Sequence, residues 1–135
     1  MAVLEFDGYR VLELAYSKNL SFKNDENNLS FNPKFSVEFK VISDKDASVV
    51  LGFTTKEELP FDITVKIEGD FVYENGEDDK NIGFDSLLKK NATAILFPYL
   101  RMIVSQITGI DDEFPMLVLP TMNIEKFIED REKGR

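Results

Sequence analysis

The spacing of apolar residues changes once along this chain, from every second residue in the first half to helical spacing in the second. Residues 35–41 alternate strictly, with apolar side chains on one face of an extended segment and polar side chains on the other. Residues 61–71 repeat this alternation. Strands with one buried face show this pattern, and they are characteristic of antiparallel sheets. The first half of the chain therefore predicts an antiparallel sheet.

Two further segments complete the predicted sheet. Residues 48–54 are rich in β-branched side chains and follow a polar turn, which predicts a hairpin with the preceding strand. Residues 9–16 predict a less regular strand, because Val11, Leu12 and Leu14 break the alternation. Within the last strand, Gly69 predicts either a bulge or a close approach to the backbone.

A long helical stripe of apolar residues occupies positions 87–107. Asp85 or Ser86 is the expected N-cap, and Gly109 follows the last turn. Pro98 lies inside the stripe and predicts a kink or two abutting helices, because proline lacks the N–H that the helix needs. The stripe is longer than a few short strands can cover, which indicates helix packing between subunits.

An unusually apolar segment follows the helix at residues 114–120, where prolines discourage both helix and central strand. We expect an extended loop over the surface. Asn123 then predicts the cap of a short amphipathic helix. The chain is expected to form one α+β domain over residues 1–135, with the sheet at about 9–73 and the helical part at about 84–131.

Composition excludes several functions. The chain lacks Cys, His and Trp, which removes thiol nucleophiles, disulfides, imidazole or thiolate zinc sites and every histidine base. The 25 acidic residues against 16 basic ones give a net charge of −9, and no basic cluster suits a nucleic acid. The sequence shows neither a signal peptide nor a membrane-spanning run, so we expect a cytoplasmic protein that does not insert into membranes.

Metal and enzyme alternatives have little support in the sequence. The acidic runs at 77–79 and 111–113 lack the ligand spacing of a calcium loop, so solvated loops are the simpler interpretation and no metal is expected. No glycine-rich phosphate loop is present. An enzyme with a carboxylate site stays open as a separate hypothesis, although the acids lie on outer strand faces or in turns.

Three stretches resemble the SecB family of export chaperones. Residues 95–101 (Ile-Leu-Phe-Pro-Tyr-Leu-Arg) resemble the Leu-Phe-Pro-Tyr-x-Arg motif of the family's long helix. Residues 114–120 (Phe-Pro-Met-Leu-Val-Leu-Pro) resemble the loop that follows it, and residues 16–22 (Tyr-Ser-Lys-Asn-Leu-Ser-Phe) resemble the first-strand motif. The order of sheet, long helix, apolar loop and short helix also agrees.

The resemblance implies a four-stranded antiparallel sheet with a long kinked helix and a short C-terminal helix packed on one side. It implies a homotetramer, built as a dimer of dimers, and no cofactor or ATP. Members of the family are holdases that bind unfolded or precursor polypeptides in apolar grooves, and many deliver them to the SecA translocase. Related chaperones guard an antitoxin instead. A SecB-like chaperone dedicated to one such client, without SecA, is the alternative.

The resemblance departs from the family where SecA docks. The acid of the first-strand motif is replaced by Asn19, the acid after the motif by Lys23, and a glutamate of the sheet by Thr64. The acidic tail is also missing at residues 131–135. The remaining candidates for a motor-docking surface are Asn19, Asp62, Glu68 and Asp70.

Two groups of candidate site residues follow. The apolar loop predicts a peptide-binding site, since its side chains are more apolar than an exposed loop ordinarily tolerates; a loop buried over the helix is the alternative. Its candidates are Phe114, Met116, Leu117, Leu119 and Met122. The helix motif gives candidates for the oligomer interface, with a purely structural kinked helix as the alternative. They are Leu96, Phe97, Tyr99, Leu100, Arg101 and Ile103.

Overall fold

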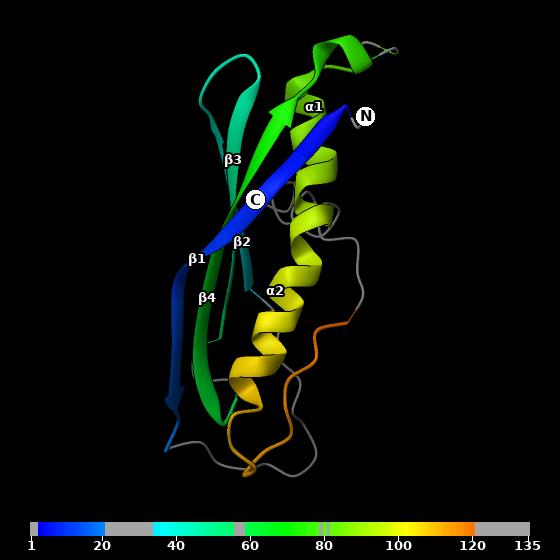
Figure 1. Ribbon diagram of the computed structural model, residues 1–135. Coiled ribbons are helices and arrows are strands. Elements are labelled where there is room, and N and C mark those ends of the chain that lie inside the picture. The colour runs from blue at the N-terminus through cyan, green and yellow to red at the C-terminus, as the bar shows by residue number, and fades with distance from the viewer. Residues whose placement is uncertain (1–2, 21–33, 56–58, 79, 81, 121–135) are drawn as a thin grey trace.

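The computed structural model describes residues 3–20, 34–55, 59–78, 80 and 82–120. It contains one antiparallel sheet in the order β1-β4-β3-β2, as Figure 1 shows. The strands are β1 (Leu4–Lys18), β2 (Lys34–Val41), β3 (Asp46–Thr54) and β4 (Phe61–Tyr73). All four predicted strands are present, and the predicted β2–β3 hairpin is confirmed by a continuous register from Lys34 opposite Thr54 to Val41 opposite Ala47.

Strand β1 is the longest strand, although its alternation is the least regular. Its pairing with β4 shifts between Phe6 and Tyr9 and again between Val11 and Glu13. Gly8 lies in the first irregularity with a φ of +95°, a conformation that glycine adopts without a steric penalty. The second inserts Leu12, so that Val11 and Leu14 stand opposite the inward residues Ile67 and Val65. The broken sequence pattern therefore reflects a bulge.

A single helical segment of 25 residues follows the sheet. It comprises α1 (Phe84–Leu87), a π-helical turn η2 (Leu88–Ala92) and α2 (Thr93–Thr108). A short 3-10 turn, η1 (Asn75–Glu77), precedes it. Pro98 lies inside α2, which continues through it, so of the two alternatives, a kink or two abutting helices, the second is excluded.

The start of the helical segment differs from the expectation. Asp85 and Ser86 were the expected caps, but the helix begins at Phe84, and Gly83 precedes it with a φ of +95°. The Asp78 carboxylate accepts hydrogen bonds from the backbone N–H groups of Ile82 (2.9 Å) and Gly83 (2.8 Å). These two hydrogen bonds hold the pKa of Asp78 below its ordinary value. Asp78, several positions before the helix, therefore fixes the backbone that leads into it.

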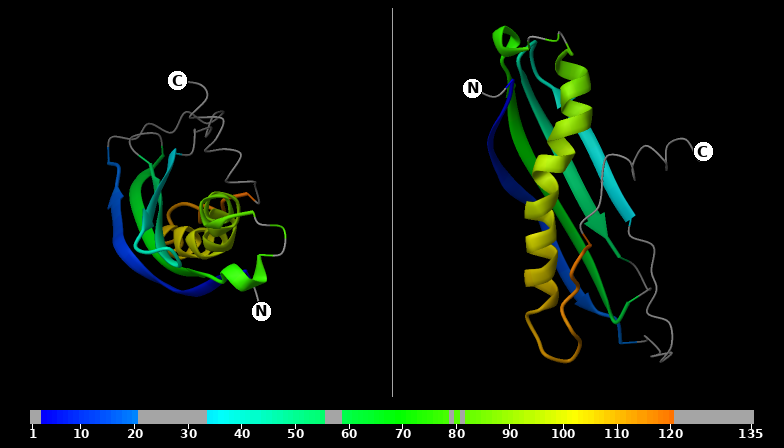
Figure 2. Two further views of the ribbon diagram at one scale, coloured as in Figure 1. Left: turned by 90° about the horizontal axis from the view of Figure 1, so that it is seen from above. Right: turned by 90° about the vertical axis from the view of Figure 1, so that its right-hand side faces the viewer.

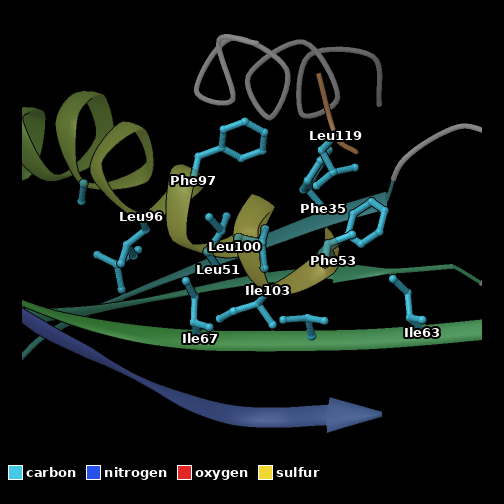
Figure 3. Close-up of a cluster of buried hydrophobic side chains, with 14 of the residues drawn as sticks. Phe35, Leu51, Phe53, Ile63, Ile67, Leu96, Phe97, Leu100, Ile103 and Leu119 are labelled. Atoms are coloured by element: carbon cyan, nitrogen blue, oxygen red, sulfur yellow. The ribbon is translucent and has the colours of Figure 1, made fainter. Parts of the chain in front are cut away.

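The helix crosses the concave face of the sheet, and the core lies between them (Figure 2). Strand β3 is buried along almost its whole length, and β4 buries alternate residues. Figure 3 shows Leu96, Leu100 and Ile103 of the helix pointing toward side chains of the sheet. The core includes Leu51, Phe53, Ile63, Ile67, Leu96, Leu100 and Ile103.

Gly69 lies where a side chain of the helix comes close to the backbone of the sheet. A Cβ atom added there would lie 2.6 Å from Leu96 Cδ2 and 3.2 Å from Phe71 Cε2. The expected close approach at Gly69 is therefore present, and its cause is a leucine side chain of α2.

We expect Gly69→Ala to lower the free energy of unfolding by about 1–3 kcal/mol, the usual cost of overpacking a core. Urea unfolding would measure the change. In a Leu96→Ala background the same substitution should cost much less, because the atom that it meets is gone. Equal costs in both backgrounds would contradict the assignment of Leu96 as the obstacle.

After α2 the chain turns back along the helix as an extended segment that ends at Pro120 in the described part of the structure. The expected short C-terminal helix and its cap Asn123 lie outside the described residues, as do Lys23, Met122 and the tail at 131–135. Within the ranges described, no helix is both long enough and apolar enough to cross a membrane.

Candidate functional site

The loop at residues 114–120 is fastened to α2 through its backbone. Arg101 Nε donates to the carbonyl of Leu119 (2.6 Å), and Ser105 Oγ donates to the carbonyl of Leu117 (3.2 Å). The backbone N–H of Leu117 donates to Thr108 Oγ1 (2.8 Å). Buried or half-buried backbone groups need such partners, and here helix side chains provide them in place of a neighbouring strand. This explains how an apolar segment without regular structure keeps a fixed path.

The side chains of the loop alternate between the core and the solvent. Leu119 is 2% exposed and belongs to the core, whereas Leu117 is half-buried against it. Met116 and Val118 are each 53% exposed. The loop is therefore buried on one side only: one row of side chains covers the helix and the other faces solvent. Val118 was not among the candidates, and the alternation in an extended segment was the signal that identifies it.

The exposed row continues beyond the loop. Ile110, in the turn after α2, is 66% exposed. Met116 lies over the backbone of Gly109, since a Cβ atom there would be 3.2 Å from Met116 Cε. We call Ile110, Met116 and Val118 the apolar loop surface. Methionine is flexible and polarizable, which suits contact with side chains of varied shape.

A cluster of charges holds the turn before the loop against the end of β1. Lys18 Nζ lies 3.1 Å from Asp111 Oδ2 and 3.0 Å from Glu113 Oε2. The same ammonium lies 5.4 Å from the ring centroid of Phe114, which is half-buried. Tyr16 OH donates to Asp111 Oδ2 (3.5 Å). The pKa of Lys18 is raised, chiefly by its hydrogen bond with Glu113.

The pKa of Asp111 is lowered, first by the hydrogen bond from Lys18 and then by that from the Glu113 backbone N–H. A carboxylate with a lowered pKa stabilises the fold above its unfolded pKa, and that contribution is lost as the pH falls through the folded pKa. We therefore expect the Lys18–Asp111 ion pair to persist down to pH values below 3.8, the ordinary value.

Carboxyl ¹³C NMR would follow the titration of Asp111 directly. In a Lys18→Met variant the Asp111 midpoint should move upward, toward the ordinary value, because the first cause of the shift is removed. An unchanged midpoint would show that Lys18 does not interact with Asp111 in solution.

Most residues expected at the oligomer interface are buried within the chain itself. Leu96, Leu100, Phe97 and Ile103 are at most 8% exposed and lie in the core of the single chain. Tyr99 is half-buried, and its ring lies 4.6 Å from that of Tyr9 and 5.6 Å from that of Phe6 on β1. Arg101 is half-buried and binds the loop. The motif that suggested an interface therefore mainly fixes the helix to its own sheet and loop.

Other apolar residues are exposed on α2 and β1. Ala94, Pro98 and Met102 are four residues apart and lie with Gln106 on the exposed side of α2. On β1, Val11 and Leu14 face the helical side of the sheet but are 46% and 55% exposed. These β1 residues lie between the Tyr9–Tyr99 contact and the Tyr16–Asp111 contact, on the part of the strand that the helix leaves uncovered.

The four motor-docking candidates do not form one acidic surface. Asn19, at the end of β1, donates from Nδ2 to the carbonyl of Leu59 (3.3 Å). Asp62, Glu68 and Asp70 occupy alternate positions on the outer side of β4. Asp62 is half-buried and has a partner of its own.

Arg10 neutralises the two remaining acids of β4, Glu68 and Asp70. Its guanidinium lies 2.8 Å from Glu68 Oε1 and donates to both oxygens of Asp70 (2.9 and 3.0 Å). Lys40 adds an ion pair with Glu68 at 3.5 Å. The hydrogen bonds from Arg10 lower the pKa of Asp70. Sequence reasoning missed Arg10, because its place opposite Glu68 depends on the irregular register of β1.

Several acidic side chains of the described residues take part in surface interactions. Within the described ranges, no group of three or more acidic side chains is placed to hold a metal ion. The described acids with lowered pKa values are held by cations or backbone N–H groups on the surface. What the geometry offers is an ordered apolar surface beside a tightly packed core.

The family model described as preprotein translocase subunit SecB matches residues 9–134. The chain therefore belongs to the SecB family, and the chaperone class suggested by the sequence motifs is confirmed. No curated protein sequence matches this chain.

Solved structures share the fold at low sequence identity. A protein of unknown function from Streptococcus agalactiae aligns with a TM-score of 0.59 and 18% identity, covering 87% of this chain and 97% of that one. A SecB-like chaperone of Mycobacterium tuberculosis, in complex with a ChAD peptide from the HigA1 antitoxin, aligns with a TM-score of 0.59 and 16% identity. That alignment covers 88% of this chain and 90% of the other. The predicted fold class is confirmed, apart from the C-terminal helix.

Proposed function

We propose that this SecB-family chaperone is an ATP-independent holdase that binds unfolded polypeptides through the apolar loop surface. The observation that carries the proposal is the pair Met116 and Val118, half exposed on a loop whose backbone is fixed by Arg101 and Thr108. An exposed apolar row loses little entropy on binding when its backbone is already ordered. The protein acts by binding alone, without catalysis, cofactor or metal.

The charge of the chain supports the same function. A net charge of −9 keeps a protein with exposed apolar residues soluble. An unfolded client contributes apolar side chains, which gain free energy when they leave water. We place the protein in the cytoplasm, as a single domain over residues 1–135.

The partners divide into two cases. An export chaperone would deliver its client to SecA, and a dedicated chaperone would retain one partner such as an antitoxin. The ion pairs of Glu68 and Asp70 with Arg10 favour the second case, because these carboxylates are already neutralised. The bound antitoxin peptide in the Mycobacterium tuberculosis chaperone is a precedent for such a client. The family membership supports the first.

A pull-down with purified SecA separates the two cases. Wild-type protein and an Arg10→Ala variant, which frees Glu68 and Asp70, would be compared. If only the Arg10→Ala variant binds SecA, Arg10 blocks the acidic face of β4 in the wild type. The chaperone would then work without SecA. Binding by the wild type would support export.

We also propose that the protein assembles as a homotetramer, a dimer of dimers, through the outer stripe of α2 and the uncovered part of β1. The exposed apolar residues on these two elements are Pro98 and Met102 on α2 and Val11 and Leu14 on β1. A second copy would cover them and remove apolar area from water.

The holdase proposal is tested by aggregation of a chemically unfolded model protein, followed by light scattering without nucleotide. We expect the protein to suppress scattering at near-stoichiometric ratios. If the protein does not suppress scattering at any ratio, the general holdase proposal is overturned. Family membership would then describe the fold alone.

A further inference from the structure

We infer that Lys18 is a positioning residue for the client-binding loop, tying the end of the sheet to the turn from which the loop starts. The inference rests on the proposed function, because it names the residue that holds the proposed site in place. Lys18 belongs to β1 and is far from the loop in sequence, and its contacts with residues 111–114 join the two.

The surroundings of Lys18 are unusual for a lysine on a strand. By its register opposite Phe61, Lys18 is directed to the helical side of the sheet, and its side chain is only 23% exposed. Its ammonium contacts Asp111, Glu113 and Phe114, which are three of four consecutive residues. One cation therefore orders both carboxylates and the aromatic ring of the turn.

The turn and the loop are held at separate places. The helix side chains Arg101 and Ser105 hold the carbonyls of Leu119 and Leu117, while Lys18 holds residues 111–114. Met116 lies between these two anchored parts. Its place over Gly109 thus depends on both anchors.

Removal of the cation has a defined electrostatic consequence. Asp111, Asp112 and Glu113 form a run of three acids, and Lys18 is the cation paired with two of them among the described residues. Without Lys18 these carboxylates would repel one another, and Phe114 would lose the ammonium over its ring. The long hydrogen bond from Tyr16 OH to Asp111 (3.5 Å) would remain, so the turn should be held less firmly against the end of β1.

The test compares Lys18→Met, which keeps an apolar stem without the charge, with Lys18→Arg, which keeps a cation. Lys89→Met is the matched control, because Lys89 pairs with Asp85 on the exposed helix surface away from the loop. Backbone amide exchange would report the order of residues 111–117. Dissociation of a fluorescent apolar peptide would report client binding, and thermal melts would confirm that each variant folds.

We expect Lys18→Met to accelerate exchange in the turn and to raise the peptide dissociation rate by about fivefold, the size expected for the loss of two exposed ion pairs. Lys18→Arg should restore both, and Lys89→Met should change neither. If amide exchange in the turn is unchanged in Lys18→Met, Lys18 does not hold the turn against β1 and the inference is overturned. Faster exchange with unchanged peptide dissociation would overturn the positioning role while the holdase stands.

The proposed function and this inference fail in distinguishable ways. If the wild type binds no peptide, the holdase proposal fails and the positioning role fails with it. Exchange in the turn would still show whether Lys18 orders residues 111–114, since that measurement needs no client.

Discussion

Replacing Met116 and Val118 together with aspartate should abolish the protection of an unfolded client while leaving the protein folded. Both side chains are 53% exposed, so neither aspartate has to be buried in the free protein. On binding, each carboxylate would be desolvated against apolar client residues, which is costly without a partner. We expect the ratio of chaperone to client at half protection to rise by at least about tenfold, equivalent to roughly 1.4 kcal/mol.

The matched control is the double variant Ile42→Asp, Ile82→Asp. Ile42, between β2 and β3, is 71% exposed and Ile82, before α1, is 45% exposed, and the chemical change is the same. The β2–β3 turn and the start of α1 lie at the end of the sheet opposite the turn that follows α2 (Figure 1). Protection should be unchanged in the control. If both double variants lose protection equally, general charge repulsion rather than the apolar loop surface would explain the result.

The choice of residues for this experiment depends on the structure. A variant with aspartate at Leu117 and Leu119 would seem equivalent from the sequence, because all four residues belong to one apolar run. Leu119 is 2% exposed, however, and its aspartate would place a charge in the core. Loss of activity in that variant would report unfolding and would not identify a binding site.

The second large effect concerns the two faces of α2. We expect Leu96→Asp to prevent folding, because Leu96 is fully buried against Gly69 and a buried unpaired charge costs several kcal/mol, about 3–5 for a broken buried pair. Circular dichroism and urea unfolding should show little cooperative structure.

Met102→Asp is the matched variant on the same helix. Met102 is 44% exposed, so the variant should fold with a similar melting temperature. If the outer stripe of α2 is a subunit contact, light scattering should show a smaller assembly than the wild type. A folded Leu96→Asp protein would contradict the packing of the helix on the sheet, and an unchanged mass for Met102→Asp would exclude Met102 from the subunit contact.

The core and the strands were largely predictable from the sequence because they depend on local periodicity. Residues 35–41 and 61–71 alternate, and the structure pairs both segments with β3 between them. The strand at 9–16 was predicted despite its irregularity, but its two bulges were not. A broken alternation does not by itself show which residue is the extra one, and a bulge changes which later residues share a face.

The function of single residues was less predictable, because a helical stripe does not identify what covers it. Leu96, Phe97 and Leu100 have the apolar character of an interface, and the structure uses them to pack α2 on its own sheet. Arg101 has the charge of a surface residue, but it binds the loop carbonyl of Leu119. Sequence motifs correctly assigned the family, but they did not show that several of the proposed interface residues are buried within the chain.

The sequence by itself determined the order of the elements, the fold class and the family, since these follow from apolar periodicity and from motifs of consecutive residues. Only the tertiary structure decided which face of α2 is open, which loop side chains face solvent and which acids are neutralised. Those properties depend on residues far apart in the chain, such as Lys18 with Asp111 and Arg10 with Asp70. The physical reason is that burial and ion pairing are set by three-dimensional proximity, which local sequence patterns do not specify.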